Sequence, residues 1–234
     1  MRRVMFVWLV TIGMAAPAFA QDKPVEINIG GGATFPVSNF KNDFNTGGNF
    51  DIGATFWLNP NIGIQAQYTY TRMNGPEKTI TVTPAPGVGV GTNQLIQSNQ
   101  QIHAGVFDVV GRSHNTDAVA NGYFLGGLGI YHRGLQLTSP AVGYTTICDP
   151  YWLVCYPAAV SVDNILGERT SNDFGINFGG GVTFGHEAKF YVEMRYTYVW
   201  GPTITTPTNL PAGATPSSTS SNATYWPLTF GVRF

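Results

Sequence analysis

The last ten residues of the chain, 225–234, read YWPLTFGVRF. Their side chains fall into two alternating sets. One set is apolar or aromatic throughout: Trp226, Leu228, Phe230, Val232 and Phe234. The other carries small or polar groups beside one tyrosine: Tyr225, Pro227, Thr229, Gly231 and Arg233. A period of two residues predicts a β-strand with one apolar face. Such a strand suits a soluble sheet as well as a membrane barrel, so the other segments decide between them.

The N-terminus has the three parts of a secretory signal peptide. Two arginines precede an apolar stretch from Val4 to about Ala16, and Ala-Phe-Ala at 18–20 forms a small-x-small cleavage site. The apolar stretch is shorter than the roughly 20 residues of a spanning helix, which argues against a membrane anchor. We therefore expect residues 1–20 to be a signal peptide and the mature chain to begin near Gln21.

The composition is unusual for a soluble domain. Charged residues make up 11% of the chain, against about 25% in typical domains, while aromatic residues reach 13% and glycines number 29. Mean hydropathy is +0.00, but barrel strands escape hydropathy scans because only alternate residues face lipid. The formal net charge of −1 gives no footprint for nucleic-acid binding.

Eight segments of about ten residues have strand character, which is the length that a tilted strand needs to cross a membrane. They are 25–35, 48–57, 62–71, 100–112, 121–133, 173–184, 188–200 and 225–234. Short turns follow the second, fourth and sixth segments, whereas the loops near 36–48, 73–99, 134–170 and 201–221 are long. Alternation of short periplasmic turns and long outward loops is typical of outer-membrane barrels. A secreted β-sandwich or lipocalin-like barrel, the alternative, has no special reason to show it.

Residues 21–234 are therefore predicted to form an all-β fold, an eight-stranded antiparallel up-and-down transmembrane β-barrel. The faces of 100–112 alternate poorly and stay unassigned. In 121–133 we expect Tyr123, Leu125 and Tyr131 to face lipid. Aromatic residues near strand ends are expected in interfacial belts: Trp57, Tyr70, Tyr131, Trp200 and Trp226.

Several segments resemble one known family. The processing site at 18–20, the glycine-rich first strand, GGNFDIGATFWLNPNIGIQAQYTYT, GGGVTF, KFYVEMRYTYV and the terminal WPLTFGVRF are similar to the outer-membrane β-barrel domain of opacity-like and OmpA/OmpX-type proteins. The resemblance implies an eight-stranded barrel of the bacterial outer membrane acting in adhesion, as a scaffold or as a small pore. It also implies that Phe234 is the assembly signal read by the barrel-assembly machinery. The proline-rich loops and the cysteine pair depart from the family pattern.

An eight-stranded barrel is just wide enough for side chains to fill its interior. The charged residues expected there form a lumen charge lattice: Glu26, Asp51, Asp173, Lys189, Glu193, Arg195 and Arg233. Unpaired buried charges are costly, so we expect ion pairs, including one between Glu26 and Arg233 at a shared rim. The lattice is either a static core or a gate that exchanges partners and passes water or small ions; the sequence leaves both open.

Cys148 and Cys155 lie in CDPYWLVC, within a long loop. In an oxidising compartment this spacing favours a local disulfide over half of a metal site, because no histidine or second cysteine pair lies nearby in sequence. Metal-ligand spacing is otherwise absent, no P-loop precedes a helix, and no histidine stands in the His-x-Ser arrangement of deacylase-type barrels. No cofactor is predicted.

The sequence thus favours a non-enzymatic outer-membrane protein with a structural or surface-interaction role through its extracellular loops. A narrow pore for ions or small apolar solutes is the alternative, and a lipid A-modifying enzyme is less favoured. Expected partners are outer-membrane lipid and lipopolysaccharide, the barrel-assembly machinery, and an unidentified extracellular partner. Arg72 and Arg133, near the outward strand ends, could meet lipopolysaccharide phosphates or equally be solvated rim charges.

Overall fold

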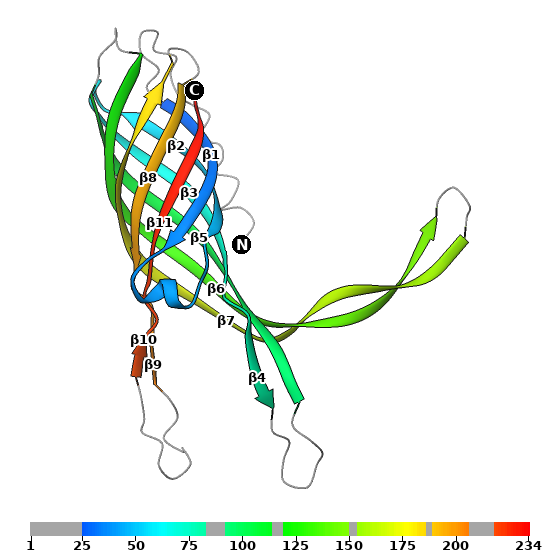
Figure 1. Cartoon of the computed structure of the whole chain (residues 1–234). Coiled ribbons are helices and arrows are strands. Elements are labelled where there is room, and N and C mark those ends of the chain that lie inside the picture. The colour runs from blue at the N-terminus through cyan, green and yellow to red at the C-terminus, as the bar shows by residue number, and fades with distance from the viewer. Residues whose placement is uncertain (1–24, 83–91, 114–118, 150–153, 186–188, 206–217) are drawn as a thin grey trace, which may run out of the picture.

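The computed structural model describes residues 25–82, 92–113, 119–149, 154–185, 189–205 and 218–234. The expected signal peptide lies outside them. Eight long strands of the described residues form a closed antiparallel barrel (Figure 1). They are β1 (Val25–Pro36), β2 (Gly47–Trp57), β3 (Ile62–Asn74), β5 (Thr92–Arg112), β6 (Ala120–Asp149), β7 (Val154–Phe184), β8 (Lys189–Val199) and β11 (Ala223–Arg233). The predicted fold class is confirmed.

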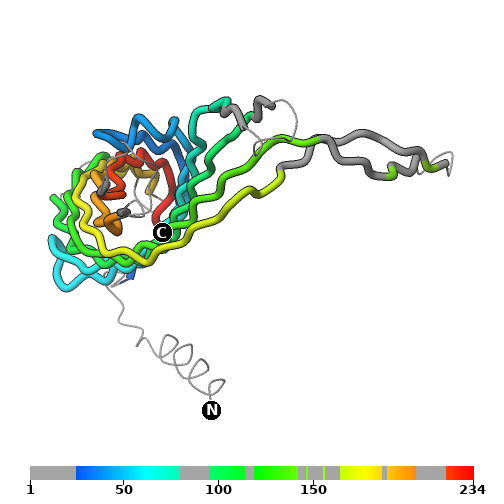
Figure 2. The backbone as a smooth tube through the Cα atoms, turned by 90° about the horizontal axis from the view of Figure 1, so that it is seen from below, coloured from blue at the N-terminus to red at the C-terminus, as the bar shows by residue number. Residues whose placement is uncertain are grey.

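The barrel closes where the first strand meets the last. β1 pairs antiparallel with β11, with Asn28 opposite Arg233, and β3 pairs with β5. The backbone N–H of Phe234 also donates to the carbonyl of Ile27 at 3.0 Å. Seen along its axis, the barrel is a ring from which one long hairpin projects (Figure 2).

Alternating side chains explain why these segments form barrel strands. Apolar side chains such as Ile52, Phe107 and Ile130 are exposed on the outer wall, whereas polar residues such as Asn28, Thr55 and Gln65 are buried inside. The faces predicted for the last segment are confirmed, and β1, β2, β3 and β8 alternate between exposed and buried side chains in the same way. Among the described residues, no helix has the length and apolarity to cross a membrane.

Two strands depart from the expected orientation. Tyr123, Leu125 and Tyr131 were expected to face lipid, but all three are buried in the interior, and Tyr131 is 1% exposed. Their neighbour Phe124 is exposed instead, as are Leu128 and Ile130 further along. In β5 the unassigned faces are now clear, because the buried set is itself largely apolar: Ile102, Ala104, Val106, Asp108 and Val110. Apolarity marks the lipid face only where the lumen is polar.

The predicted long loops contain paired strands. In 73–99, β4 (Lys78–Val82) pairs with the start of β5, and in 134–170 the ladder of β6 and β7 runs on to Cys148 and beyond. In 201–221, β9 (Thr203–Thr205) pairs with β10 (Ser218–Ser220), and 36–48 holds the 3₁₀ helix η1 (Ser38–Asn42). Outside the membrane neither face must be uniformly apolar, so strands continue there without the alternation that reveals them in sequence.

The longest extension is a two-stranded ribbon. The pairing of β5 with β6 ends at Gln97 opposite Thr138, and a register shift in the β6–β7 ladder occurs between Leu137 and Thr138. Beyond this point β6 pairs with β7 alone, so we call residues 138–165 the arm. A register irregularity bends a strand locally, which fits the way the arm leaves the barrel wall (Figures 1 and 2).

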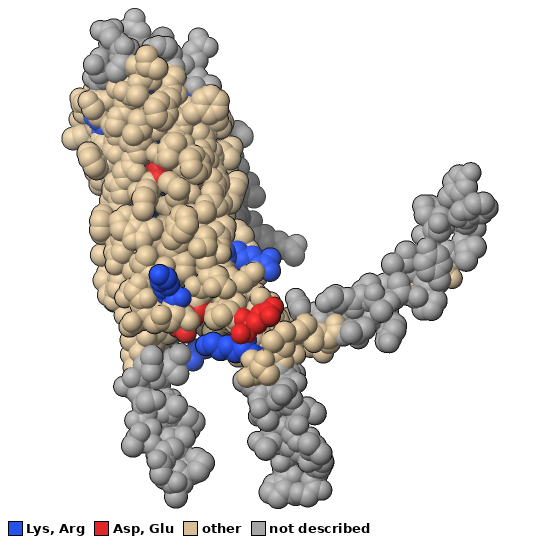
Figure 3. Space-filling view, in the orientation of Figure 1, with Lys and Arg blue, Asp and Glu red and all other residues tan. Residues whose placement is uncertain are grey.

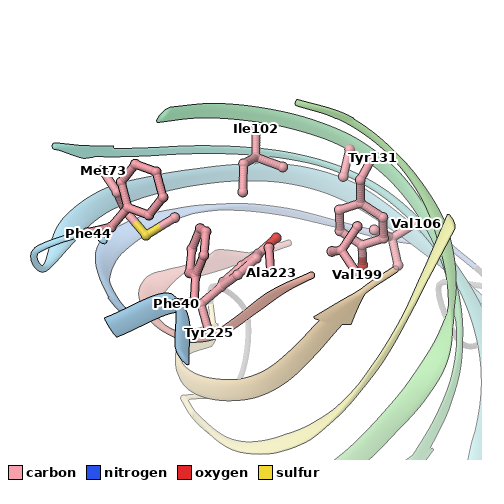
Figure 4. Packing of buried hydrophobic residues seen from close by; sticks show 10 residues of the cluster. Phe40, Phe44, Met73, Ile102, Val106, Tyr131, Val199, Ala223 and Tyr225 are labelled. Atoms are coloured by element: carbon pink, nitrogen blue, oxygen red, sulfur yellow. The ribbon is translucent and has the colours of Figure 1, made fainter. Parts of the chain in front are cut away.

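A cluster of buried apolar side chains closes the barrel at the end where the hairpins leave. It joins side chains near η1 to residues of five strands, and Figure 4 shows them converging inside the mouth. The members are Phe40, Phe44, Met73, Ile102, Ala104, Val106, Tyr131, Val199, Ala223 and Tyr225. We call this cluster the outer plug, because long connections mark the outer side of such barrels.

Candidate functional site: the barrel lumen

A network of polar side chains fills the middle of the lumen, and Arg195 is its centre. The Arg195 guanidinium donates to Glu193, to Asp108 Oδ2 at 2.7 Å and to Gln67. Gln67 Nε2 donates in turn to Asp51 Oδ2 at 2.6 Å. We call this group, with two tyrosines described next, the central network.

Two tyrosine hydroxyls complete the central network. Tyr191 donates to Asp51 Oδ1 at 2.9 Å, and Tyr123 donates to Glu193 Oε2 at 2.7 Å. Arg233 lies against both rings, with its guanidinium carbon 4.7 Å from the Tyr123 centroid and 5.4 Å from that of Tyr191. The two arginines thus oppose three buried carboxylates, those of Asp51, Asp108 and Glu193.

A second charged group lies at the rim with the short turns. Glu26 Oε1 accepts from Lys189 Nζ at 2.8 Å and from Arg112 Nη1 at 3.0 Å. The Arg112 guanidinium also stacks on Trp57, 3.6 Å from the ring centroid. Trp57 is therefore buried rather than part of the interfacial belt expected for it. Among the ion pairs of the described residues none joins Glu26 to Arg233, so that predicted pair is wrong, although both side chains are buried at the same end of the barrel.

A third group lies at the outer end. Arg133 Nη1 donates to Asp173 Oδ2 at 3.2 Å and to the carbonyl of Ser221 at 2.7 Å. Arg133 is consequently buried, not displayed to lipopolysaccharide as expected, whereas Arg72 is exposed. The predicted lattice therefore consists of three groups at different depths. Sequence reasoning missed Asp108 and Arg112, which lie on the strand whose faces could not be assigned.

Little free space remains beside the central network. A cavity of about 30 Å³ lies between the network and the outer plug, with Asp51, Gln67, Arg195, Tyr131 and Tyr225 in its wall. That volume holds on the order of one water molecule. Side chains thus fill the cross-section of the lumen at this depth.

The described histidines lie on the outer wall. Tyr70, His103, His132 and Asn172 are consecutive neighbours across four strands. His103 Nδ1 is 2.7 Å from the Tyr68 hydroxyl, and His132 Nδ1 is 2.7 Å from Asn172 Oδ1. In the described part of the chain no group of three His, Cys, Asp or Glu side chains could hold a metal ion. This row fits a polar and aromatic interfacial belt.

The cysteines occupy the tip of the arm. The ladder places Cys148 opposite Cys155, and Cys155 is disulfide-bonded. On the barrel itself, charged side chains gather where the hairpins leave it, and the wall in this view is almost free of them (Figure 3). An uncharged band around a barrel is the surface that contacts hydrocarbon.

Comparison with known proteins agrees with this architecture. Comparison with curated proteins gives no significant match. Among solved structures, the chain is similar to the attachment invasion locus protein Ail of Yersinia pestis, at 14% identity over 90% of this chain and 96% of that one, with a TM-score of 0.40. Neisserial surface protein A is also 14% identical, with the same coverage and a TM-score of 0.44.

The outer membrane protease OmpT of Escherichia coli is 14% identical over 82% of this chain and 64% of that one, with a TM-score of 0.43. All three TM-scores are below 0.5, so the function of none of these proteins is transferred. The family described as outer membrane protein beta-barrel domain matches residues 6–234. The chain therefore belongs to the outer-membrane protein β-barrel domain family and is a multi-pass protein of the bacterial outer membrane.

Proposed function

We propose that this protein is a non-enzymatic, non-conducting barrel that holds its hairpins at the cell surface, for a structural or surface-interaction role. The observation that carries the proposal is the contrast between the filled lumen and the long hairpins beyond it. The central network and the outer plug occupy the lumen in series, while the arm extends far past the barrel wall (Figure 1).

The filled lumen argues against the pore. A conducting path needs a continuous column of water, and the free volume beside Arg195 is about 30 Å³. Exchange of partners within the central network would leave a buried carboxylate unpaired at some point, which is costly in the barrel interior. The same reasoning argues against catalysis in the lumen, since its carboxylates are bound to Arg195, Gln67 and tyrosines and lie beneath the outer plug.

Planar-bilayer recording tests the closed lumen. The mature protein is refolded into lipid, its folding is verified by heat-shifted mobility on gels, and single-channel current is measured. We expect a folded barrel without steady openings. Steady openings that change when Arg195 is replaced would contradict the proposal and make transport the leading function.

Removal of the arm tests the surface role. In the variant, a two-residue turn replaces residues 139–164, so that the β6–β7 hairpin closes where its pairing with β5 ends. Because the barrel ladder is untouched, we expect a heat-modifiable barrel in the outer membrane with reduced adhesion or autoaggregation of the cells. If adhesion, autoaggregation and envelope resistance to detergent were all unchanged, the arm would have no role of this kind.

A further inference from the structure

A pocket of about 420 Å³ opens beside the outer plug, and we call it the mouth pocket. Side chains of η1, β5 and β6, with nearby connections, form its wall. The apolar part of that wall is made by Phe40, Phe44, Pro76, Ile96, Leu135 and Leu137. The volume lies within the roughly 300–1,000 Å³ of small-molecule sites, which combine apolar walls with a few polar groups.

Two buried donors in the wall have no hydrogen-bond partner. Gln100 is 2% exposed and its Nε2 is unpartnered; Arg133 is 7% exposed and its Nε is unpartnered. Both residues also line a smaller adjoining cavity of about 60 Å³. A buried donor without an acceptor is unfavourable, so this end of the pocket favours a ligand that supplies acceptor oxygens.

The charges around these donors favour an anion over a cation. Arg169 lines the adjoining cavity and Lys78 lines the mouth pocket. Opposing them, Asp173 pairs with Arg133 at 3.2 Å, and Asp43 lies in the wall of the mouth pocket beside Phe40 and Phe44. The three cations are thus Lys78, Arg133 and Arg169, against the carboxylates of Asp43 and Asp173. The smaller cavity, where the unpartnered donors lie, is lined by Gln100, Arg133 and Arg169.

We propose that the mouth pocket binds a monocarboxylate of the fatty-acid class. The carboxylate accepts hydrogen bonds from Gln100 Nε2 and Arg133 Nε, and the alkyl chain lies against Phe40, Phe44 and Leu135. An alkane would leave both donors unpaired, and an alkylammonium would add a third donor and a like charge. The pairing of an apolar wall with two unpartnered donors therefore favours an anionic head group as well as an alkyl chain.

The test uses the mature protein in phosphatidylcholine nanodiscs and dodecanoate carrying a diazirine on its chain. After irradiation, labelled residues are mapped by mass spectrometry. We expect saturable labelling on η1 and around Leu135, above the non-saturable labelling of lipid-facing strands. Unlabelled dodecanoate should compete at least about tenfold better than dodecanol, because dodecanol lacks the charge that meets Arg133.

Gln100 and Gln101 provide a matched pair of variants. They are consecutive on β5, but only Gln100 lines the pocket, and Gln101 alternates to the outer face. We expect Gln100→Leu to weaken labelling about tenfold and Gln101→Leu to leave it unchanged. Heat-shifted mobility verifies folding of both. Should Gln100→Leu fail to fold, Ile96→Trp serves instead, because its ring fills the apolar part and should abolish the saturable labelling.

Three results would overturn the proposal. Labelling confined to lipid-facing residues would place the probe in the bilayer rather than in the pocket. Equal competition by dodecanol or dodecyltrimethylammonium, or better competition by dodecyl phosphate, would reject the carboxylate head group. Equal effects of the Gln100 and Gln101 variants, or unchanged labelling of the Ile96 variant, would show that the ligand does not bind in the mouth pocket. This test measures neither conductance nor adhesion, so a negative result would leave the proposed surface role untouched.

Discussion

Arg195 is the side chain on which the central network depends. It is 6% exposed and it contacts Glu193, Asp108 and Gln67, each from a different position on the lumen wall. A buried charge network of this kind is stabilising only while every member is paired. Loss of the Arg195 side chain should therefore lower the stability of the whole barrel.

Replacement of Arg195 should destabilise the barrel strongly. Arg195→Met keeps much of the side-chain volume but leaves Glu193 and Asp108 as buried carboxylates without their cation. Removing one partner of a buried pair costs about 3–5 kcal/mol, and we expect a loss of that size in the free energy of unfolding. Urea unfolding in lipid vesicles, followed by tyrosine and tryptophan fluorescence, measures it.

Arg72→Met is the matched control. Arg72 is exposed at the outer rim, so its replacement should change the free energy of unfolding by less than about 0.5 kcal/mol. Equal unfolding midpoints for the two variants would show that Arg195 is dispensable for stability.

Part of this network could be predicted from the sequence. Asp51, Glu193 and Arg195 alternate with clearly apolar neighbours, and all three were placed in the lumen correctly. Asp108 could not be found in the same way, because it shares its face with Ile102 and Val106, which pack in the outer plug. Tyr123, predicted to face lipid, instead donates from its hydroxyl to Glu193 in the lumen. The partner of each charged side chain depends on the register between neighbouring strands, and the sequence of one strand does not reveal that register.

Adjacent glycines in β6 show how closely neighbouring strands approach. A Cβ on Gly127 would lie 1.9 Å from the carbonyl oxygen of Phe107, whereas a Cβ on Gly126 would meet no atom nearer than 3.6 Å. The clash is with backbone, which cannot rotate away. β5 and β6 therefore need glycine at 127 to keep their separation.

Gly127→Ala should consequently weaken the barrel and Gly126→Ala should not. We expect Gly127→Ala to cost about 1–3 kcal/mol, as overpacking typically does, and Gly126→Ala to change the free energy of unfolding by less than about 0.5 kcal/mol. The same urea titration in vesicles compares them. A larger loss of stability in the Gly126 variant would mean that contacts on the lipid face, not the close approach of β5 and β6, require glycine here.

The arm should depend on its disulfide. An isolated two-stranded ribbon is marginally stable in water, and the bond at Cys155 closes this one near its tip. We expect maleimide to label no thiol before reduction and two after it, and reduction to speed proteolysis of the arm without affecting the barrel. Labelling of two thiols before reduction would contradict the predicted Cys148–Cys155 bond.

Among the elements, the membrane strands were predictable and the hairpins outside were not. Between lipid and a polar lumen, alternation is imposed on each strand, which is why β1, β2, β3, β8 and β11 were located to within a few residues. In 134–170 apolar and polar residues do not alternate, and the Pro, Gly and Ser content favours a loop, yet β6 and β7 continue there as a ladder.

Phe234 should matter for assembly in the cell more than for stability, if it is the assembly signal that the family resemblance implies. Phe234 is 48% exposed on the outer wall, and its bonds to Ile27 are made by the backbone alone. We therefore expect Phe234→Ala to lower the heat-modifiable fraction in cells several-fold while refolding into vesicles stays normal. Phe230→Ala, at a similar exposure of 54% on the same strand, is the control. Equal heat-modifiable fractions in cells for the two variants would show that Phe234 has no special role in assembly.

The pairing of β1 with β11 also constrains when the molecule can form. This contact joins the first and last of the described barrel strands, so it has very high sequence separation, and it cannot form until β11 has been synthesised. Until then β1 and the most recently formed strand each present an unpaired backbone edge. Such edges, flanked by apolar side chains, are templates for aggregation. A newly made chain therefore cannot close its barrel before β11 is available, so closure is a late step in its folding.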